Sequence, residues 1–103
     1  MMEAMVLEHA VLEVVPGREA SFEEAFATAK GIIATASGFR SLSLSRCVEH
    51  GNRYLLQVEW ETLEDHTEGF RGSGAYQEWR RLLHHHYDPF PVVEHYEAVV
   101  RVA

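Results

Sequence analysis

The chain is poor in cysteine, lysine and long apolar runs, and each shortage excludes a class of protein. Its single cysteine, Cys47, cannot close an internal disulfide, so we expect a protein of the reducing cytoplasm. It has one lysine and a net charge of −7, so it should repel phosphate backbones and bind no nucleic acid. No apolar stretch approaches the roughly 20 residues of a membrane span, and residues 1–5 lack the basic and apolar segments of a signal peptide.

What the chain does contain is typical of one small globular domain. It has 103 residues, of which 47% are hydrophobic, and we expect residues 1–103 to form a single domain. The runs at residues 6–15 and 92–100 carry apolar side chains at both odd and even positions. Since successive strand residues point to opposite faces, such strands need cover on both sides. A second copy of the chain is the simplest cover for one face, so we expect a homodimer.

The spacing of apolar residues, with the turn and capping residues between the runs, predicts the order β-α-β-β-α-β. Alternating residues indicate four strands, at residues 6–15, 39–49, 53–61 and 92–100. An amphipathic helix is predicted over residues 18–35, with Ser21 and Glu24 as a capping box. The second helical region is split. Thr62 and Asp65 cap its short first part, and Ser73 caps a helix whose inward stripe reaches Tyr87.

This order is the split βαβ, ferredoxin-like arrangement of the α+β class. It predicts a four-stranded antiparallel sheet in which the first and third strands are central. Both helical segments should lie on one face of that sheet. The other face is uncovered in a single chain, and two such faces packed together would form a dimeric α+β barrel.

Short motifs along nearly the whole chain resemble the antibiotic biosynthesis monooxygenase family of the dimeric α+β barrel superfamily. They are Val15-Pro16-Gly17 before Phe22 and Phe26, Gly38-Phe39, Trp60-Glu61-Thr62 before His66, Ser73 with Tyr76 and Trp79, and the segment Pro91–Tyr96. The resemblance implies a dimer with a pocket between sheet and helices. Members include oxygenases of aromatic polyketides that use no metal or flavin, and haem-degrading proteins. Here Ala10 replaces the asparagine of the haem-degrading pattern and Trp79 lies near its histidine position, which argues against haem degradation.

Two residues are candidates for proton chemistry. His66 lies on the inward face of the short helix, where it could bind a substrate oxygen or accept a proton near neutral pH. It could equally brace the loop before Ser73. Glu8 shares a strand face with apolar neighbours, and burial there would raise its pKa toward that of a general base. An exposed strand edge or an interface ion pair is the alternative for Glu8.

Aromatic residues on the second helical region are candidates for substrate binding. Phe70, Tyr76 and Trp79 could form a slot for a flat molecule, although core residues would give the same pattern. Trp60 is interpreted as structural. His9 and His95 lie on paired strands and could approach each other on the dimer side of the sheet.

The run His84–His86 does not predict a metal site. Consecutive helical residues point about 100° apart, so three adjacent histidines cannot reach one ion. We expect a mostly solvated helix end, no bound metal and no cofactor. Cys47 has no evident base nearby and is not expected to act as a nucleophile.

Two functions remain open at this point. The first is a cofactor-independent monooxygenase acting on a small aromatic or quinol-like molecule, which the aromatic residues and His66 favour. The second is a non-catalytic small-ligand-binding or stress-response barrel, which the missing polar residues of the family favour. Haem binding is a third and weaker hypothesis.

Overall fold

The computed structural model describes residues 5–103. The prediction that the N-terminal residues form no signal peptide concerns residues 1–5, and four of these lie outside the described part. The elements are β1 (Val6–Glu13), α1 (Glu19–Ile33), β2 (Phe39–Arg46), β3 (Arg53–Trp60), η1 (Asp65–Phe70), α2 (Gly74–Leu83), η2 (His84–His86) and β4 (Val93–Glu97). None of the helices in the described range has the length and hydropathy of a membrane span.

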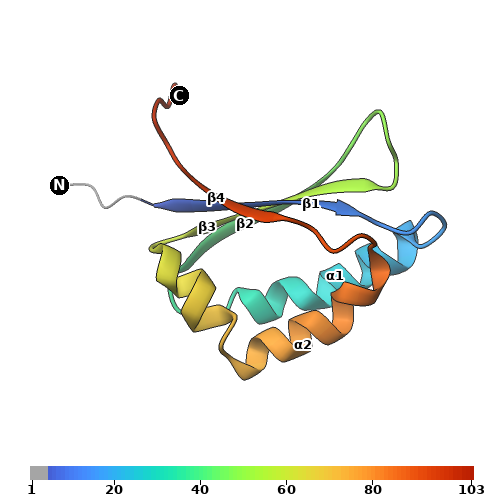
Figure 1. The fold of residues 1–103 in the computed structure, drawn as a ribbon, viewed down its shortest axis with the longest axis horizontal. Coiled ribbons are helices and arrows are strands. Elements are labelled where there is room, and N and C mark those ends of the chain that lie inside the picture. The colour runs from blue at the N-terminus through green and yellow to red at the C-terminus, as the bar shows by residue number, and fades with distance from the viewer. Residues whose placement is uncertain (1–4) are drawn as a thin grey trace.

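The four strands form one antiparallel sheet in the order β2-β3-β1-β4, with β1 and β3 central. Figure 1 shows α1 and α2 beneath one face of this sheet, while no described element covers the other face. The ferredoxin-like α+β fold predicted from the residue pattern is therefore confirmed. We call the uncovered side the open face.

The alternation along the central strands decides which residues face the helices. In β3 the four residues Tyr54, Leu56, Val58 and Trp60 are buried, while their neighbours are only partly so. In β1 the buried residues are Glu8, Ala10 and Leu12. They pack with apolar side chains of the two helices, which include Phe22, Phe26, Ala29, Ile33, Trp79 and Leu83. The core is thus a single layer between sheet and helices.

The predicted helix starts are partly right. The Thr62–Asp65 capping box is present, with the Thr62 N–H donating to Asp65 Oδ2 at 3.2 Å and the Asp65 N–H to Thr62 Oγ1 at 3.1 Å. The Ser73 hydroxyl also caps α2 as predicted. The Ser21–Glu24 box is wrong, because α1 begins one turn earlier and the Ser21 hydroxyl donates instead to the Arg18 carbonyl at 3.0 Å.

The last strand is shorter than the apolar run that predicted it. β4 ends at Glu97, which pairs with Val6 at the start of β1. This is the last pair of the two strands among the described residues, and residues 98–100 are not assigned to a strand. Val99 and Val100 are 95% and 80% exposed. The apolar character of the segment therefore continues past the last strand position.

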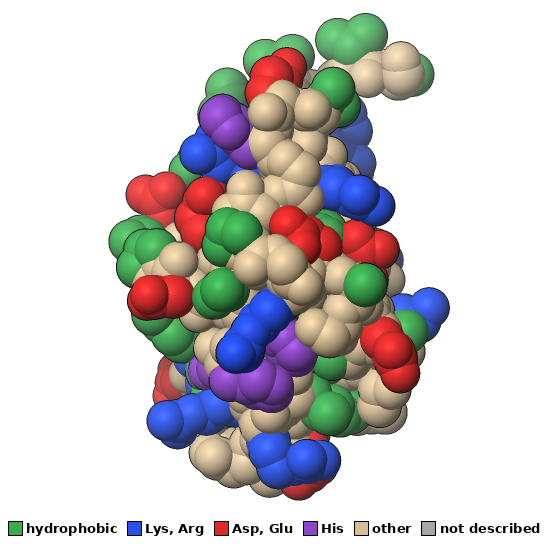
Figure 2. Space-filling view, turned by 90° about the vertical axis from the view of Figure 1, so that its right-hand side faces the viewer, with side chains coloured by type: hydrophobic (Ala, Val, Ile, Leu, Met, Phe, Trp, Pro, Cys, Tyr) green, Lys and Arg blue, Asp and Glu red, His purple; other side chains and the backbone are tan. Residues whose placement is uncertain are grey.

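The histidine run is not the mostly solvated helix end that was predicted. Only His85 is exposed; His86 packs against Phe22 with ring centroids 6.0 Å apart, and His84 lines a cavity. The reason is that η2 turns the chain back toward the sheet, where Tyr87 forms a bridge with Val14. Tyr87 is thus buried by this bridge and not as part of a helical stripe. Figure 2 shows histidine side chains gathered in one patch beside a basic side chain on this end of the molecule.

Candidate functional site

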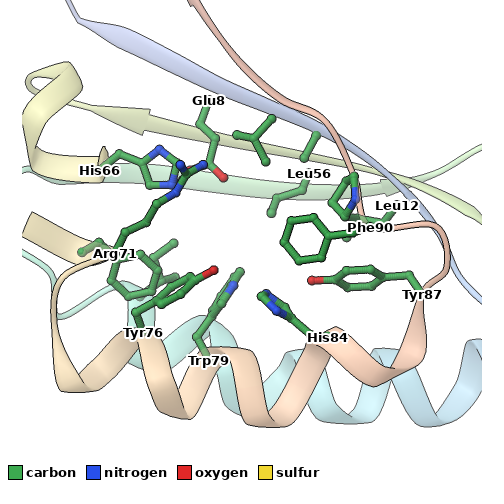
Figure 3. A pocket seen from close by; sticks show the side chains of 15 residues that line it. Glu8, Leu12, Leu56, His66, Arg71, Tyr76, Trp79, His84, Tyr87 and Phe90 are labelled. Atoms are coloured by element: carbon green, nitrogen blue, oxygen red, sulfur yellow. The ribbon is translucent and has the colours of Figure 1, made fainter. Parts of the chain in front are cut away.

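A cavity of about 330 Å³ lies between the sheet and the second helical region. Its volume is at the lower end of the range for small-molecule pockets, which suits a ligand of one or two rings. The cavity is lined by Glu8, Ala10, Leu12, Ile33, Leu56, His66, Phe70, Arg71, Tyr76, Trp79, His84, Tyr87, Phe90, Pro91 and Val93. Figure 3 shows Glu8 above the cavity, with the rings of Tyr76, Trp79 and His84 below it.

Glu8 is the carboxyl group of this cavity. It is 5% exposed, and its Oε1 accepts a hydrogen bond from Trp60 Nε1 at 3.0 Å. The same Oε1 lies 3.3 Å from His66 Nε2. Within residues 5–103 no hydrogen bond reaches Oε2, and Figure 3 shows the carboxyl group directed into the cavity. Burial raises the pKa of Glu8, outweighing the opposite effects of the Trp60 hydrogen bond and of the Arg71 charge.

His66 is held over Trp60 by a loosely wound turn. The Arg71 N–H donates to the His66 carbonyl at 3.1 Å, five residues back, as in a π-helix. The imidazole stacks on the Trp60 indole with a centroid distance of 5.3 Å and is 3% exposed. Burial first, and then the positive charges of Arg71 and His95, lower the pKa of His66 to about 3. Burial thus shifts both pKa values in the direction that favours the neutral form of each group, and the two groups lie in close contact.

His95 extends this arrangement toward the edge of the sheet. The register places it directly opposite Glu8, and its Nε2 lies 2.8 Å from His66 Nδ1. Burial, together with the Arg71 charge, lowers the pKa of His95. The expectation that His9 and His95 approach each other is wrong, because His9 pairs with Glu94 and so points to the open face, where its ring contacts Tyr96 edge-on at 5.5 Å.

The three predicted aromatic residues all line the cavity. Phe70 packs edge-on against Tyr76 at 5.5 Å and against Trp79 at 5.9 Å. Phe70 and Trp79 are buried and belong to the core as well, whereas Tyr76 is partly exposed. These rings therefore serve both as core residues and as walls of the cavity. Tyr87 adds a further hydroxyl, whose pKa burial raises, so this group stays protonated and can donate a hydrogen bond.

Sequence reasoning missed three members of this site. Trp60 was interpreted as structural, yet its indole N–H binds Glu8. No local pattern marks Arg71 in the sequence, although it lines the cavity and its charge acts on three titrating groups. The signal for His95 was present in the chain, since antiparallel pairing of the first and last strands brings residue 95 close to residue 8.

Two other candidates show no reactive arrangement. Among residues 5–103 no group of three His, Cys, Asp or Glu side chains is placed to hold a metal ion. The Cys47 thiol lies near a strand end and contacts only the Glu49 carboxylate, at 3.5 Å.

The chain is similar to a family of small α+β proteins. Residues 5–82 match the family model described as antibiotic biosynthesis monooxygenase. The chain is 57% identical over 95 residues to the uncharacterized protein YczJ of Bacillus subtilis (strain 168), a match that covers 92% of this chain and 100% of YczJ. A crystal structure from Bordetella bronchiseptica, provisionally named an antibiotic biosynthesis monooxygenase, is 39% identical with a TM-score of 0.90, over 94% of this chain and 99% of that one. A similarly named structure from Caulobacter crescentus CB15 shares the fold, with 20% identity, a TM-score of 0.79 and coverage of 95% and 92%.

Proposed function

Because the chain belongs to the antibiotic biosynthesis monooxygenase family, we propose that it is a cofactor-independent monooxygenase of a small aromatic or quinol-like molecule. One observation carries this proposal: a buried carboxyl group, Glu8, has one oxygen tied to Trp60 and the other directed into a cavity with aromatic walls. A carboxyl with a raised pKa is suited to take a proton near neutral pH.

Glu8 and His66 are the catalytic residues in this proposal. Glu8 removes a proton from an activated CH₂ group or from a hydroxyl conjugated with it, and His66 holds the carboxyl through Oε1. The resulting anion gives electrons to dioxygen, and a C–O bond forms as a hydroperoxide. Loss of water then leaves a carbonyl group. The net change is CH₂ + O₂ → C=O + H₂O, in which the substrate supplies all four electrons.

The aromatic walls and Arg71 orient the substrate. Phe70, Tyr76 and Trp79 present ring faces and edges to a flat molecule in the small cavity. Arg71 lies at the same cavity, and none of the ion pairs formed within residues 5–103 includes it. Its guanidinium is therefore available to the negative oxygen that develops when the substrate loses its proton.

We also propose that two copies of this single-domain chain pair through their open faces, in the cytoplasm. The open face carries apolar groups such as Val11 and Tyr96, which are 41% and 47% exposed. A hollow on this side is lined by residues of β1 and β4 and of the segment that follows β4, together with charged side chains such as Arg40 and Glu59. A second chain covering this surface would remove exposed apolar area from water, which stabilises a small domain. The lone cysteine is compatible with a reducing compartment.

The test is aerobic turnover of one- and two-ring phenols and hydroquinones that carry an activated CH₂. The native chain should consume oxygen and place ¹⁸O from ¹⁸O₂ in the product carbonyl. Glu8→Gln and His66→Ala should each lose about 10²-fold or more in kcat. His9→Gln, on the opposite face of the strand that carries Glu8, is the matched control and should keep full activity. If no substrate gives oxygen uptake above background, the chain is a ligand-binding barrel and not an oxygenase.

A further inference from the structure

We infer that Glu8, His66 and His95 form a proton relay that connects the cavity with the edge of the sheet, with His95 as its solvent end. This inference rests on the proposed function for the source of the proton. It adds a residue, His95, that the proposed chemistry does not itself require. Three features of the structure carry it: the continuity of the contacts, the gradient of burial, and the atoms that stay free at each end.

The contacts form a continuous chain through both nitrogens of His66. His66 Nε2 lies 3.3 Å from Glu8 Oε1, and His66 Nδ1 lies 2.8 Å from His95 Nε2. A neutral imidazole has one N–H donor and one acceptor nitrogen, so it can receive a proton on one side and release one on the other. The stack on Trp60 and the Trp60 hydrogen bond to Oε1 hold the ring and the carboxyl in this alignment.

The outer end of the relay is the least buried of its three members. Glu8 and His66 are 5% and 3% exposed, whereas His95 is only partly buried. His95 also lies on β4, an edge strand of the sheet, so no further strand covers it. The free atoms are Glu8 Oε2 at the cavity and His95 Nδ1 at the outer end, since the described hydrogen bonds use the other atom of each group.

Proton transfer through this chain balances at every atom. The relay starts with Glu8 protonated on Oε1, His66 on Nδ1 and His95 on Nδ1. Oε2 takes the substrate proton, and the Oε1 proton passes to His66 Nε2. The His66 Nδ1 proton then passes to His95 Nε2, and the His95 Nδ1 proton leaves to water. Each group gains one proton and loses one, so all three stay neutral while one proton crosses from substrate to solvent and the negative charge stays on the substrate, at the cavity that Arg71 lines. After oxygen has added, a proton that returns along the same chain protonates the peroxide and restores the starting protonation of all three groups.

The surroundings favour such a neutral transfer. Arg71, from the loop before α2, is the charged group that acts on all three members, and it opposes a lasting positive charge on either histidine. The other titratable groups around the cavity are Tyr76 from α2, His84 from η2 and Tyr87 beyond it. Burial lowers the pKa of His84 and raises that of Tyr87, so neither supplies a competing charge near neutral pH.

The first experiment is chemical rescue of turnover. In a weakly buffered solution His95→Ala should lower kcat at least about 10-fold, and added imidazole should restore it in proportion to its concentration. His9→Ala, a histidine on the open face, should show neither the loss nor the rescue. A loss that imidazole does not restore would mean that His95 only positions His66, and no loss at all would mean that protons leave by another route; either result overturns the relay.

The second experiment needs no substrate and so separates the relay from the proposed oxygenase. Nuclear magnetic resonance of the ¹⁵N-labelled full chain measures how fast the ring N–H of His66 exchanges with water. If His95 conducts the proton, His95→Phe, which keeps the bulk of the ring, slows this exchange several-fold. If His66 exchanges only by local opening, the same variant leaves the rate unchanged or faster, and the relay is refuted even where the oxygenase is active. Slower exchange in a chain without oxygenase activity supports the relay and rejects the oxygenase.

Discussion

The buried pair of Glu8 and His66 should reveal itself in how stability depends on pH. The perturbation is Glu8→Gln, which removes a titrating group and keeps its size. In the native fold burial favours the neutral form of both groups, since it raises the pKa of Glu8 and lowers that of His66 to about 3. In the unfolded chain both groups titrate near their ordinary values of 4.5 and 6.5. The two groups therefore act on stability with opposite signs.

The lowered pKa of His66 gives stability that is fully present above pH 6.5 and is lost as pH falls toward 3, because only the unfolded chain takes up the proton. The raised pKa of Glu8 acts in reverse. Its contribution is fully present below pH 4.5 and is lost as pH rises through the folded-state value. In the pH range in which Glu8 is protonated in the folded chain and His66 is charged in the unfolded chain, the two residues together hold one proton in either chain. The free energy of unfolding of the native protein then changes little with pH.

Glu8→Gln removes this compensation. Between pH 7 and pH 4.5 the His66 shift alone amounts to about 2.5 kcal/mol of lost stability, from one proton at 1.36 kcal/mol per pH unit. The free energy of unfolding of Glu8→Gln should therefore fall by about that much over this range, whereas the native value should fall by less because the Glu8 shift acts in the opposite direction. His66→Gln should show the reverse slope and become relatively more stable as pH falls. The stability of the control variant His9→Gln should depend on pH much as that of the native chain does, because His9 lies on the open face, away from Glu8 and His66.

Urea unfolding at half-unit pH steps, followed by tryptophan fluorescence, measures these slopes, since Trp60 and Trp79 are both buried. Parallel curves for the native chain, Glu8→Gln and His66→Gln would refute the reasoning. They would mean that the carboxyl and the imidazole are not a neutral buried pair in the folded state.

Two further predictions concern the fold and its pairing. Gly38→Ala should cost about 1–2 kcal/mol or more, because residue 38 has φ +83° and a Cβ there would overlap the Asp65 carboxylate. Gly31→Ala, in open space on α1, should instead stabilise by about 0.5–1 kcal/mol, and equal effects in urea unfolding would contradict both expectations. Val11→Asp should halve the mass measured by light scattering, because it places a charge in the proposed dimer interface. Val48→Asp, at a position 94% exposed between β2 and β3, should leave the mass unchanged, and a native chain of single-copy mass would reject the pairing.

Much of the fold was predictable because its signals are local. Period-two alternation and the turn residues between strands determine the sheet, and both survive in β1 and β3 without distortion. The errors occur where a distant partner decides the outcome. The segment after Glu97 stays apolar, yet the described pairing of β4 with β1 ends at Val6, and the length of a strand depends on its partner as well as on its own residues. The backbone around Arg18, and not the Ser21 hydroxyl, starts α1.

The candidate site was predictable only in its parts. Alternation placed Glu8 on the inward face, and helical period placed His66 there too. What joins them is a contact between elements 58 residues apart, with His95 a further 29 residues on, and no local pattern encodes such a meeting. Trp60 illustrates the limit well. Its burial was easy to predict, but the direction of its indole N–H depends on the register between β1 and β3.

The alternation of β1 has a consequence for how this protein can change over evolutionary time. Glu8 and Leu12 look toward the helices while His9 and Val11 look away, so one strand serves the cavity on one side and the open face on the other. Deleting or inserting one residue within this strand, between Glu8 and Leu12, would reverse the faces of all residues on one side of the change, so that either Glu8 or Leu12 would turn outward. Substitution can therefore tune either surface separately, but a change of length here disrupts both at once.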